Sequence, residues 1–339
     1  MLRLACAAAL LLATVLVAPS AARAETYPEP VLTGDVGDPS VVADGRRLVV
    51  VATGAQVDRA VKEPGRAWRW AEPVLASRPG WARQGAIWAA DLTRVGDRWL
   101  LYFAVPVRGL GREGRCIGVA VARGPLKLFR PVGSRPLVCP ARAKVPAAAD
   151  PVVVPDLPSK GVIDPSAYEE GGRRYLLYKT DGRPSSLRLL PLTANGRNAA
   201  GASVELVRSA GVIENPVLLR NAGGYYLFAS EGDFARCTYH QTWRRSASLT
   251  AWTDAVPAVL LDRTTTGGLC GPGGGDVVVR KGRATLYFHG WVRLHSTTPK
   301  GAAFWGWNGG ERKARRAMYA ARLAFRGGVP TVVRYLPGA

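Results

Sequence analysis

The chain has few of the residues from which metal centres are usually built, and it has no known nucleic-acid-binding motif. Its three histidines, His240, His289 and His295, show no metal-ligand spacing, and no C-x-x-C pair is present to hold zinc. No helix-turn-helix, zinc-finger or RNA-binding pattern accompanies the basic residues. We therefore expect no metal site built on histidine and cysteine, and no nucleic-acid partner.

Acidic residues are also scarce, since 25 of them stand against 46 lysines and arginines, a formal net charge of +21. The basic residues are scattered singly along the chain, and the one dense cluster runs from Arg312 to Arg316. This pattern is typical of an arginine-rich solvated surface. Attraction to anionic polymers of the cell envelope is the alternative interpretation.

Beyond residue 24 the chain lacks any hydrophobic run long enough to suggest a membrane span. Residues 1–24 have the pattern of a cleaved signal peptide, with a basic start at Arg3, an apolar stretch over residues 4–17 and an A-x-A site at residues 22–24. An uncleaved anchor is the alternative, although the stretch is short for a span. We predict a secreted protein, free of the membrane after cleavage, with 44 basic residues against 25 acids and a net charge of +19.

What the sequence does have is a pattern repeated five times. Each repeat contains an acidic or glycine-rich turn, a short apolar run, a polar turn and an aromatic-rich strand. The acids are Asp38, Asp91, Asp164, Glu214 and Asp276, which stand 53, 73, 50 and 62 residues apart. A period of this size fits four short strands per repeat and indicates a β-propeller. Because propeller blades begin their inner strands beside a central channel, we expect these acids to converge on one funnel.

The repeats fill the chain after the leader. Helical periodicity is weak there, and no Ser/Gly linker or low-complexity tract divides the chain. We predict an all-β protein in which residues 25–339 form one five-bladed β-propeller domain. Residues 141–161, rich in proline and alanine, are expected to connect two blades, and residues 117–121 and 331–335 to be outer strands.

Four cysteines remain after the leader, and export favours their oxidation to disulfides. They are Cys116, Cys139, Cys237 and Cys270. Three connectivities are open, and we predict the pairing of sequence neighbours, which would link positions within one blade and between two adjacent blades. Closing a loop of either size stabilises the fold by about 3 kcal/mol.

Taken in order, the motifs resemble those of glycoside hydrolase family 43, whose five-bladed propellers remove arabinose or xylose units from polysaccharides. The resemblance runs from about Gly34 to Pro330. Its motifs are Asp-Pro at Asp38, Trp-Ala-x-Asp at Trp88, Ile-Asp-Pro at Ile163 and Glu-x-Pro at Glu214. Two weaker similarities lie at residues 117–122 and 318–323.

The resemblance implies roles for three carboxyl groups. Asp38 corresponds to the general base, Glu214 to the general acid, and Asp164 to the residue that orients the acid and raises its pKa by like-charge repulsion. In an inverting glycosidase such an acid and base lie roughly 6.5–9.5 Å apart, with the attacking water between. Turn capping is the structural alternative for both aspartates, whereas Glu214 has apolar neighbours and no evident turn role.

Three further residues are candidates for substrate binding. Trp88 is a candidate platform for a sugar ring, with a core position as the alternative. Asp91 serves either substrate or a salt bridge, and Asp276 lies in the fifth-blade segment where the family often carries a histidine that helps to hold a central cation. Gly274 stands at that histidine's position. We therefore expect no cofactor, with a structural cation near Asp276 as the alternative.

These observations predict a secreted, monomeric, inverting glycoside hydrolase that acts on a carbohydrate substrate, an α-L-arabinofuranosidase in preference to a β-xylosidase. An endo-arabinanase, including one for cell-wall arabinan, is a second alternative. A non-catalytic carbohydrate-binding propeller is the third.

Overall fold

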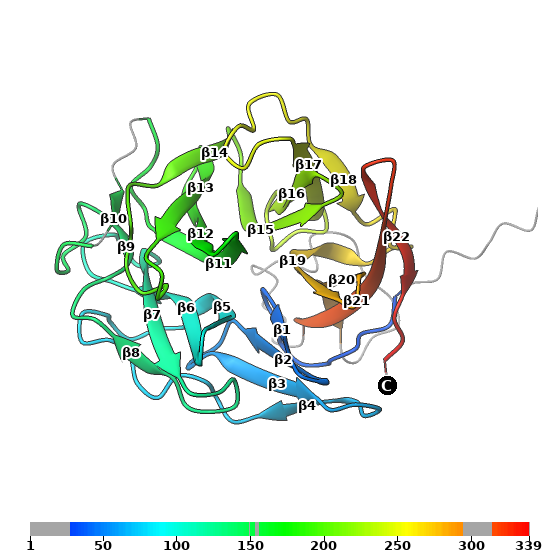
Figure 1. Cartoon of the computed structure of the whole chain (residues 1–339), viewed down its shortest axis with the longest axis horizontal. Coiled ribbons are helices and arrows are strands. Elements are labelled where there is room, and N and C mark those ends of the chain that lie inside the picture. The colour runs from blue at the N-terminus through cyan, green and yellow to red at the C-terminus, as the bar shows by residue number, and fades with distance from the viewer. Residues whose placement is uncertain (1–27, 149, 153–155, 294–313, 339) are drawn as a thin grey trace, which may run out of the picture.

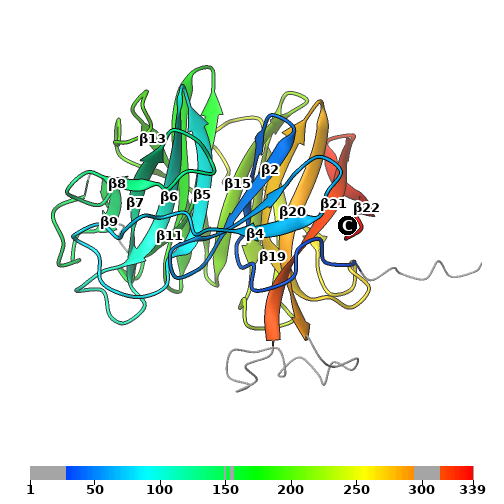
Figure 2. The ribbon, with the colours of Figure 1, turned by 90° about the horizontal axis from the view of Figure 1, so that it is seen from below.

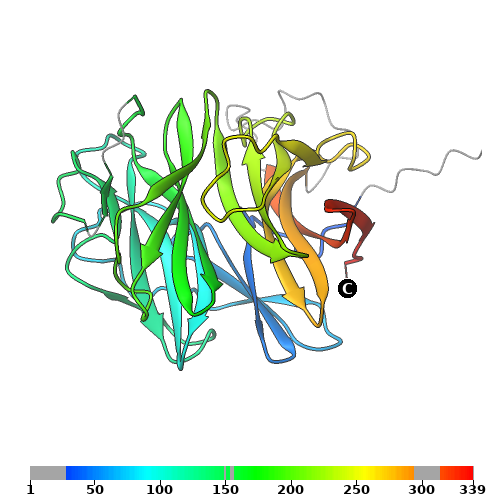
Figure 3. The ribbon, with the colours of Figure 1, turned by 45° about the horizontal axis from the view of Figure 1, so that its top comes forward.

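Five β-sheets stand radially around a central channel in the computed structural model, which describes residues 28–148, 150–152, 156–293 and 314–338 (Figure 1). Seen from the side (Figure 2) and obliquely (Figure 3), the sheets stand next to one another with their strands running between the two faces of the ring. The fold is therefore the predicted five-bladed β-propeller. The predicted leader, residues 1–24, lies outside the described residues.

Each blade is a sheet built from one continuous stretch of chain. Blade 1 contains β1 (Ser40–Asp44), β2 (Arg47–Ala52), β3 (Asp58–Lys62) and β4 (Trp68–Ala71). Blade 3 contains β11 (Val162–Glu170), β12 (Arg173–Thr180), β13 (Ser185–Leu192) and β14 (Val204–Ser209). Blade 4 contains β15 (Ile213–Asn221), β16 (Gly224–Glu231), β17 (His240–Ser246) and β18 (Ala258–Leu261). Blade 5 contains β19 (Cys270–Arg280), β20 (Arg283–Arg293), β21 (Ala314–Arg326) and β22 (Val329–Tyr335).

Blade 2 is larger than the other four. It contains β5 (Trp88–Val95), β6 (Arg98–Pro106), β7 (Arg115–Ala122), β8 (Arg130–Val132), β9 (Val138–Pro140) and β10 (Asp150–Val152). β10 pairs in parallel with β9, so the stretch 141–161, predicted to be only a connection, also supplies a short outer strand. The predicted strand 117–121 lies in β7, the third strand counted from the channel, and 331–335 lies in the outermost strand β22.

The hydrophobic core is divided among the five interfaces between neighbouring blades. The second strand of a blade is buried on both faces, and its successive side chains point to opposite neighbours. In β6, Leu100 and Tyr102 pack toward blade 3, whereas Leu101 and Phe103 pack toward blade 1. This double burial explains why the second strands read as continuous apolar and aromatic runs instead of alternating ones.

The ring closes between blade 5 and blade 1 without exchanging a strand. The N-terminal segment lies beside β21 at the place where β22 ends, with backbone hydrogen bonds between Leu32 and Met318 and between Val36 and Arg316. The last residues return to the same region, where Leu336 donates to the Ala320 carbonyl. Within the described residues, no helix is long and apolar enough to cross a membrane.

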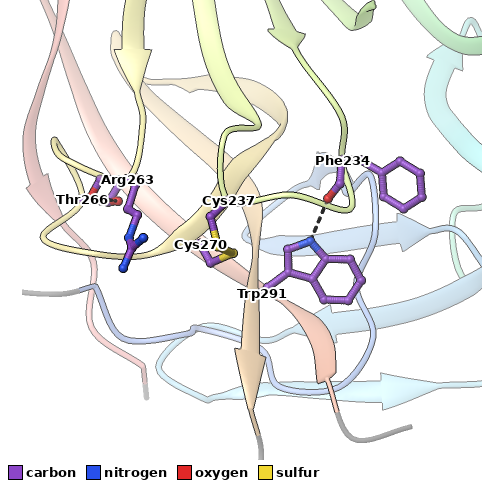
Figure 4. Close-up of a disulfide and its surroundings, with 6 residues drawn as sticks. All are labelled: Phe234, Cys237, Arg263, Thr266, Cys270 and Trp291. Carbon is purple, nitrogen blue, oxygen red and sulfur yellow. Dashed lines mark hydrogen bonds between the residues drawn. A yellow bond between two sulfur atoms is a disulfide. The ribbon is translucent and has the colours of Figure 1, made fainter. Parts of the chain in front are cut away.

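Two disulfides link the four cysteines as predicted. Cys116–Cys139 joins β7 to β9 within blade 2. Cys237–Cys270 joins the loop after β16 of blade 4 to the first residue of β19 in blade 5. Figure 4 shows this second disulfide beside Trp291, whose indole N–H donates to the carbonyl of Phe234 at 2.8 Å.

Candidate active site

Each blade places one residue in the left-handed backbone region against the central cavity, at or near the start of its inner strand. These residues are Asp38 (φ 54°), Ala89 (φ 44°), Asp164 (φ 56°), Asn215 (φ 49°) and Gly274 (φ 57°). In blades 2 to 5 the same place interrupts the pairing with the second strand, as a β-bulge does. Such strained positions gather at functional sites because the surrounding structure must hold them. The fivefold repeat is therefore a repeated backbone turn at the channel.

The five acids occupy three different positions relative to this turn. Asp38 and Asp164 are the left-handed residues themselves, Glu214 directly precedes one, and Asp91 and Asp276 follow two residues after one. Four of the five acids line the central cavity as predicted, whereas Glu214 is represented there by its neighbour Asn215, and the acids are not equivalent members of a repeat. Their different positions give them different surroundings.

The channel itself is narrow. The turn residues of all five blades line a central cavity of about 30 Å³, to which Asp38, Asp91, Asp164 and Asp276 contribute. A void of this size has room for ordered water and is too small for a sugar ring. Any sugar must therefore bind above the channel, at its mouth.

Asp38 lies among groups that stabilise its negative charge. Its carboxylate accepts hydrogen bonds from the Thr53 hydroxyl at 2.8 Å and the Asn215 amide at 3.4 Å, and Arg316 Nη1 lies 3.6 Å from Oδ2. Burial alone would raise the pKa of Asp38, but Arg316 and these two hydrogen bonds hold the pKa below its ordinary value. Asp38 is therefore ionised at neutral pH.

His289 of β20 fills the space left by the glycine at position 274. Its Nδ1 accepts a hydrogen bond from the Asp38 backbone N–H at 3.1 Å, and its ring stacks on Tyr239. A Cβ on Gly274 would lie 2.5 Å from the imidazole Cε1. Burial, and then the charge of Arg316, lower the pKa of His289 to about 3, so the ring is neutral. The sequence alone indicates no role for this histidine, because it comes from a different strand.

Glu214 is held by two partners from different blades. Lys179 of β12 donates to Oε2 at 2.7 Å, and the Tyr239 hydroxyl lies 2.9 Å from Oε1. The same hydroxyl lies 2.9 Å from the Asn215 side-chain oxygen. Because a phenol carries one proton, it donates to only one of these oxygens at a time.

Asp164 lies next to this acid. Its carboxylate accepts the backbone N–H of Asn215 at 3.0 Å. Burial, and then repulsion from Glu214, raise the pKa of Asp164 well above its ordinary value, while Lys179 acts in the opposite direction. Asp164 therefore retains a proton at a pH where an isolated carboxyl group has lost it.

Asp91 and Asp276, predicted to bind substrate, use their carboxylates to connect blades. Asp91 accepts from the Ser40 hydroxyl of blade 1 at 2.9 Å and the Ala167 N–H of blade 3 at 3.0 Å. Asp276 accepts from the Val41 N–H at 2.7 Å. Burial, and then repulsion from Asp276, raise the pKa of Asp91 to about 7, and burial raises the pKa of Asp276 to about 6.

Trp88 directly precedes the left-handed Ala89, as Glu214 directly precedes Asn215. Its ring is half-buried and stacks with the guanidinium of Arg115. One face of the indole is therefore covered by a cation from β7. This arrangement fixes the ring at the start of the strand beside the channel.

Sequence reasoning missed most of the groups that contact the three carboxyl groups. The missed residues are Thr53, Lys179, Asn215, Tyr239, His289 and Arg316. Two of them carried a signal, since Asn215 lies inside the Glu-x-Pro motif and Arg316 ends the one dense basic cluster. Among the residues that the structure describes, no group of three His, Cys, Asp or Glu side chains has the geometry to hold a metal ion.

Comparison with known proteins agrees with this geometry. The family model "Glycosyl hydrolases family 43" matches residues 27–306. The extracellular exo-α-(1→5)-L-arabinofuranosidase ArbA of Cellvibrio japonicus is 25% identical over 260 residues, covering 73% of this chain and 71% of the relative.

Solved structures share the fold. A thermostable family-43 glycoside hydrolase matches with a TM-score of 0.70 at 17% identity, over 91% of this chain and 96% of its own. An exo-1,5-α-L-arabinanase from a bovine ruminal metagenomic library matches with a TM-score of 0.66 at 19% identity, over 90% of this chain and 98% of its own. The family match spans most of the chain, and the protein therefore belongs to glycosyl hydrolase family 43.

Proposed function

We propose that this glycoside hydrolase is a secreted, monomeric enzyme that cleaves terminal arabinofuranosyl linkages with inversion, using Glu214 as general acid and Asp38 as general base. The observation that carries the proposal is the contrast between two carboxyl environments beside one channel. Asp38 is surrounded by donors and a guanidinium that lower its pKa, whereas burial and the neighbouring Glu214 raise the pKa of Asp164. Environments that drive carboxyl pKa values apart separate a base from an acid.

In this mechanism Asp38 takes a proton from the attacking water. Thr53, Asn215 and Arg316 hold its carboxylate ionised and fix its orientation. Asp38 and Glu214 are connected through Asn215 and Tyr239, one hydrogen bond at each step, without contacting each other. This intervening space supports an inverting reaction, because an inverting base and acid must leave room for water.

Glu214 protonates the leaving oxygen at the mouth, and Asp164 keeps a proton within reach of that acid. Lys179 orients Glu214 through its 2.7 Å hydrogen bond and offsets the charge that the acid acquires after it gives up its proton. Trp88 occupies the corresponding position of blade 2 and supplies an apolar face for the sugar. Asp91 and Asp276 affect substrate binding indirectly, because their hydrogen bonds fix the positions of neighbouring blades around the channel.

The name of the curated relative supports arabinofuranosyl units as the substrate and an extracellular location. The signal-like pattern of residues 1–24 supports export as well. Five hydrophobic cores within one chain support a monomer, since every blade interface is filled internally.

The test uses three substitutions and two classes of substrate. Glu214→Gln should lower kcat/KM by about 10²–10⁴-fold on arabino-oligosaccharides and far less on aryl arabinofuranosides with activated leaving groups. Asp38→Asn should abolish turnover of both classes, because no base remains to activate water. Asp164→Asn should retain partial activity and shift one limb of the pH–rate profile.

The stereochemical outcome is measured by NMR of the first-formed product, which should have inverted anomeric configuration. Retention, or a Glu214→Gln enzyme as active as the parent on natural oligosaccharides, would refute these roles. Faster turnover of aryl xylosides than of aryl arabinofuranosides would replace the proposed sugar with xylose. Binding without turnover of any glycoside would favour a carbohydrate-binding role.

A further inference from the structure

Three loops around the mouth end of blade 2 carry a large excess of positive charge. They precede β5 (76–87), connect β6 to β7 (107–114) and connect β9 to β10 (141–149). In the described part of these loops, one carboxylate, Glu113, stands against Arg78, Arg83, Arg108, Arg112, Arg142 and Lys144. The excess is local, because most of the other basic residues are scattered singly along the chain.

The loops are fixed to one another and to the blade beneath them. The Lys144 backbone N–H donates to the Arg108 carbonyl at 2.9 Å. Arg83 donates through its guanidinium to three carbonyls of the 107–114 loop. Below the loops, the Cys116–Cys139 disulfide forms a small core with apolar residues of all three loops. The charges therefore stand on an ordered base.

Four of these cations are available to a ligand, and we call Arg108, Arg112, Arg142 and Lys144 the basic rim. All four are exposed. Arg112 pairs with Glu113 at 3.4 Å with its side chain 93% exposed, and the other three side chains have no hydrogen bond or ion pair with any described residue. Exposed cations held close together without matching carboxylates create a local positive potential.

The basic rim continues into the mouth of the channel. Arg115 is the first residue of β7, directly after the 107–114 loop, and its guanidinium donates to the Ala86 carbonyl and stacks with Trp88. Ala89, the next residue after Trp88, lines the central cavity. A ligand that crosses from the channel mouth over Trp88 toward blade 2 therefore meets the basic rim.

We propose that the basic rim binds carboxylate groups on the polysaccharide that carries the scissile sugar, so that the enzyme prefers acidic substrates such as uronate-bearing chains. This inference rests on the proposed function, since the chain must pass the mouth for the rim to reach it. Guanidinium groups pair with carboxylates through two parallel hydrogen bonds. Each exposed ion pair contributes little binding free energy, but the contributions of several such pairs along one polysaccharide chain add up.

A polysaccharide fits the rim better than a nucleic acid does. The rim adjoins the mouth of a glycoside hydrolase, and among the described residues of its three loops the one aromatic side chain, Trp81, packs into the buried cores beneath. Single-stranded nucleic-acid sites combine positive charge with exposed rings on which bases stack. The rim has the charge without those rings.

The experiment compares one oligosaccharide in two chemical forms. A glucuronate-substituted arabinoxylan fragment is assayed beside the same fragment after its carboxylates have been reduced to primary alcohols. The parent enzyme should turn over the acidic form with a kcat/KM about tenfold higher, mainly through a lower KM. At 1 M salt, where charges are screened within about 3 Å, the preference should disappear.

Two variants with equal charge changes locate the effect. The rim variant carries Gln at Arg108, Arg112, Arg142 and Lys144. The control variant carries Gln at the exposed residues Arg46, Arg173, Lys281 and Arg326, which lie in hairpin turns at the opposite end of the blades. The rim variant should lose the preference and keep the parent rate on the reduced fragment, and the control should keep both.

Several results would overturn the inference. These are equal kcat/KM for the two forms in the parent, a rim variant that keeps the preference, and a control that loses it as well. Tighter competition by a single-stranded oligonucleotide than by the acidic fragment would assign the rim to nucleic acid. Direct binding of both fragments, measured by calorimetry, separates the two proposals. If the acidic fragment binds more tightly but neither is cleaved, the proposed activity fails and the basic rim stands.

Discussion

Gly274 shows how one residue type at the channel depends on a neighbour from another strand. The glycine has φ 57°, and a side chain there would enter the ring of His289 and approach Oδ1 of Asp38 to 3.2 Å. The position therefore needs glycine for space as well as for backbone conformation. Since the His289 ring accepts the Asp38 N–H, an intrusion at Gly274 would displace the proposed base.

Substituting Gly274→Ala should lower stability by about 2–4 kcal/mol and reduce kcat at least tenfold. Gly282→Ala is the matched control, because Gly282 in the β19–β20 turn has φ 71° and no neighbour within 4 Å of an added Cβ. The control should cost about 1 kcal/mol, for backbone conformation alone, and leave kcat unchanged. Denaturant unfolding and steady-state kinetics measure both, and equal losses in the two variants would mean that the clash is relieved at no cost.

Sequence reasoning found the carboxyl groups of the site because each stands in a short local motif. It did not find Tyr239, Lys179 or His289, because their contacts cross between strands or blades and leave no local spacing in the sequence. The positive φ of Asp38 and Asp164 was also out of reach. An Asp-Pro pair is equally compatible with an ordinary turn. The left-handed backbone of these residues, and the β-bulge beside Asp164, are visible only in the structure.

At the scale of elements, hydrogen bonds at the channel connect neighbouring blades. Asp91 joins blade 2 to blades 1 and 3, Asp276 joins blade 5 to blade 1, and Thr53 joins blade 1 to the Ala89 N–H of blade 2. Both aspartates have pKa values above the ordinary range, because burial penalises their charged forms. Burial therefore favours the protonated carboxyl groups, while the hydrogen bonds that connect the blades act in the opposite direction.

Asp91→Asn should make the protein more stable at neutral pH. The folded-state pKa of about 7 lies above the unfolded value near 3.9, so the neutral carboxyl contributes stability that is complete below pH 4 and is lost as pH rises through 7. An amide stays neutral, accepts the Ala167 N–H and donates to Ser40. The variant should match the parent at pH 4 and exceed it by about 1–4 kcal/mol at pH 8.

Urea unfolding from pH 4 to pH 8 tests this prediction. Asp97→Asn is the control, since Asp97 lies in the turn between β5 and β6 with its side chain 84% exposed. It measures the effect of removing one carboxyl group from an exposed position. An Asp91→Asn protein that becomes less stable than the parent as pH rises would show that the ionised carboxylate is the favoured form.

At the scale of the whole molecule, the fivefold repeat was readable because every blade uses the same hairpin beside the channel. The outer strands were less readable, since their edges pack differently in each blade, and blade 2 adds β8 and β10. The pairing of the cysteines followed from their order along the ring. Neighbours in sequence are neighbours in space when each blade is one continuous stretch of chain.

The two disulfides close loops of similar length but support different parts of the ring. Cys116–Cys139 spans 23 residues beneath the basic rim, and Cys237–Cys270 spans 33 residues between blades 4 and 5. Chain entropy predicts about 3–4 kcal/mol of stabilisation from each. Their effects on activity should differ, because the second disulfide lies near the groups that hold the proposed acid and base.

Replacing Cys237 and Cys270 together by alanine should therefore lower both stability and kcat. The loop that carries Cys237 also positions Tyr239, which contacts Glu214, and Phe234, whose ring lies 5.6 Å from the Arg316 guanidinium that faces Asp38. Loosening this loop moves a partner of each carboxyl group, and a misplacement of about 1 Å can reduce a rate about 100-fold.

Replacing Cys116 and Cys139 by alanine is the matched control for that change. It should cost nearly the same stability and leave kcat on a neutral arabino-oligosaccharide unchanged, because its loops contact none of the three carboxyl groups with proposed catalytic roles. Thermal unfolding and kinetics well below the unfolding temperature measure the two effects separately. If both double variants lose activity in proportion to stability, the disulfides act only on the fold, and the loop after β16 has no separate part in holding the active site.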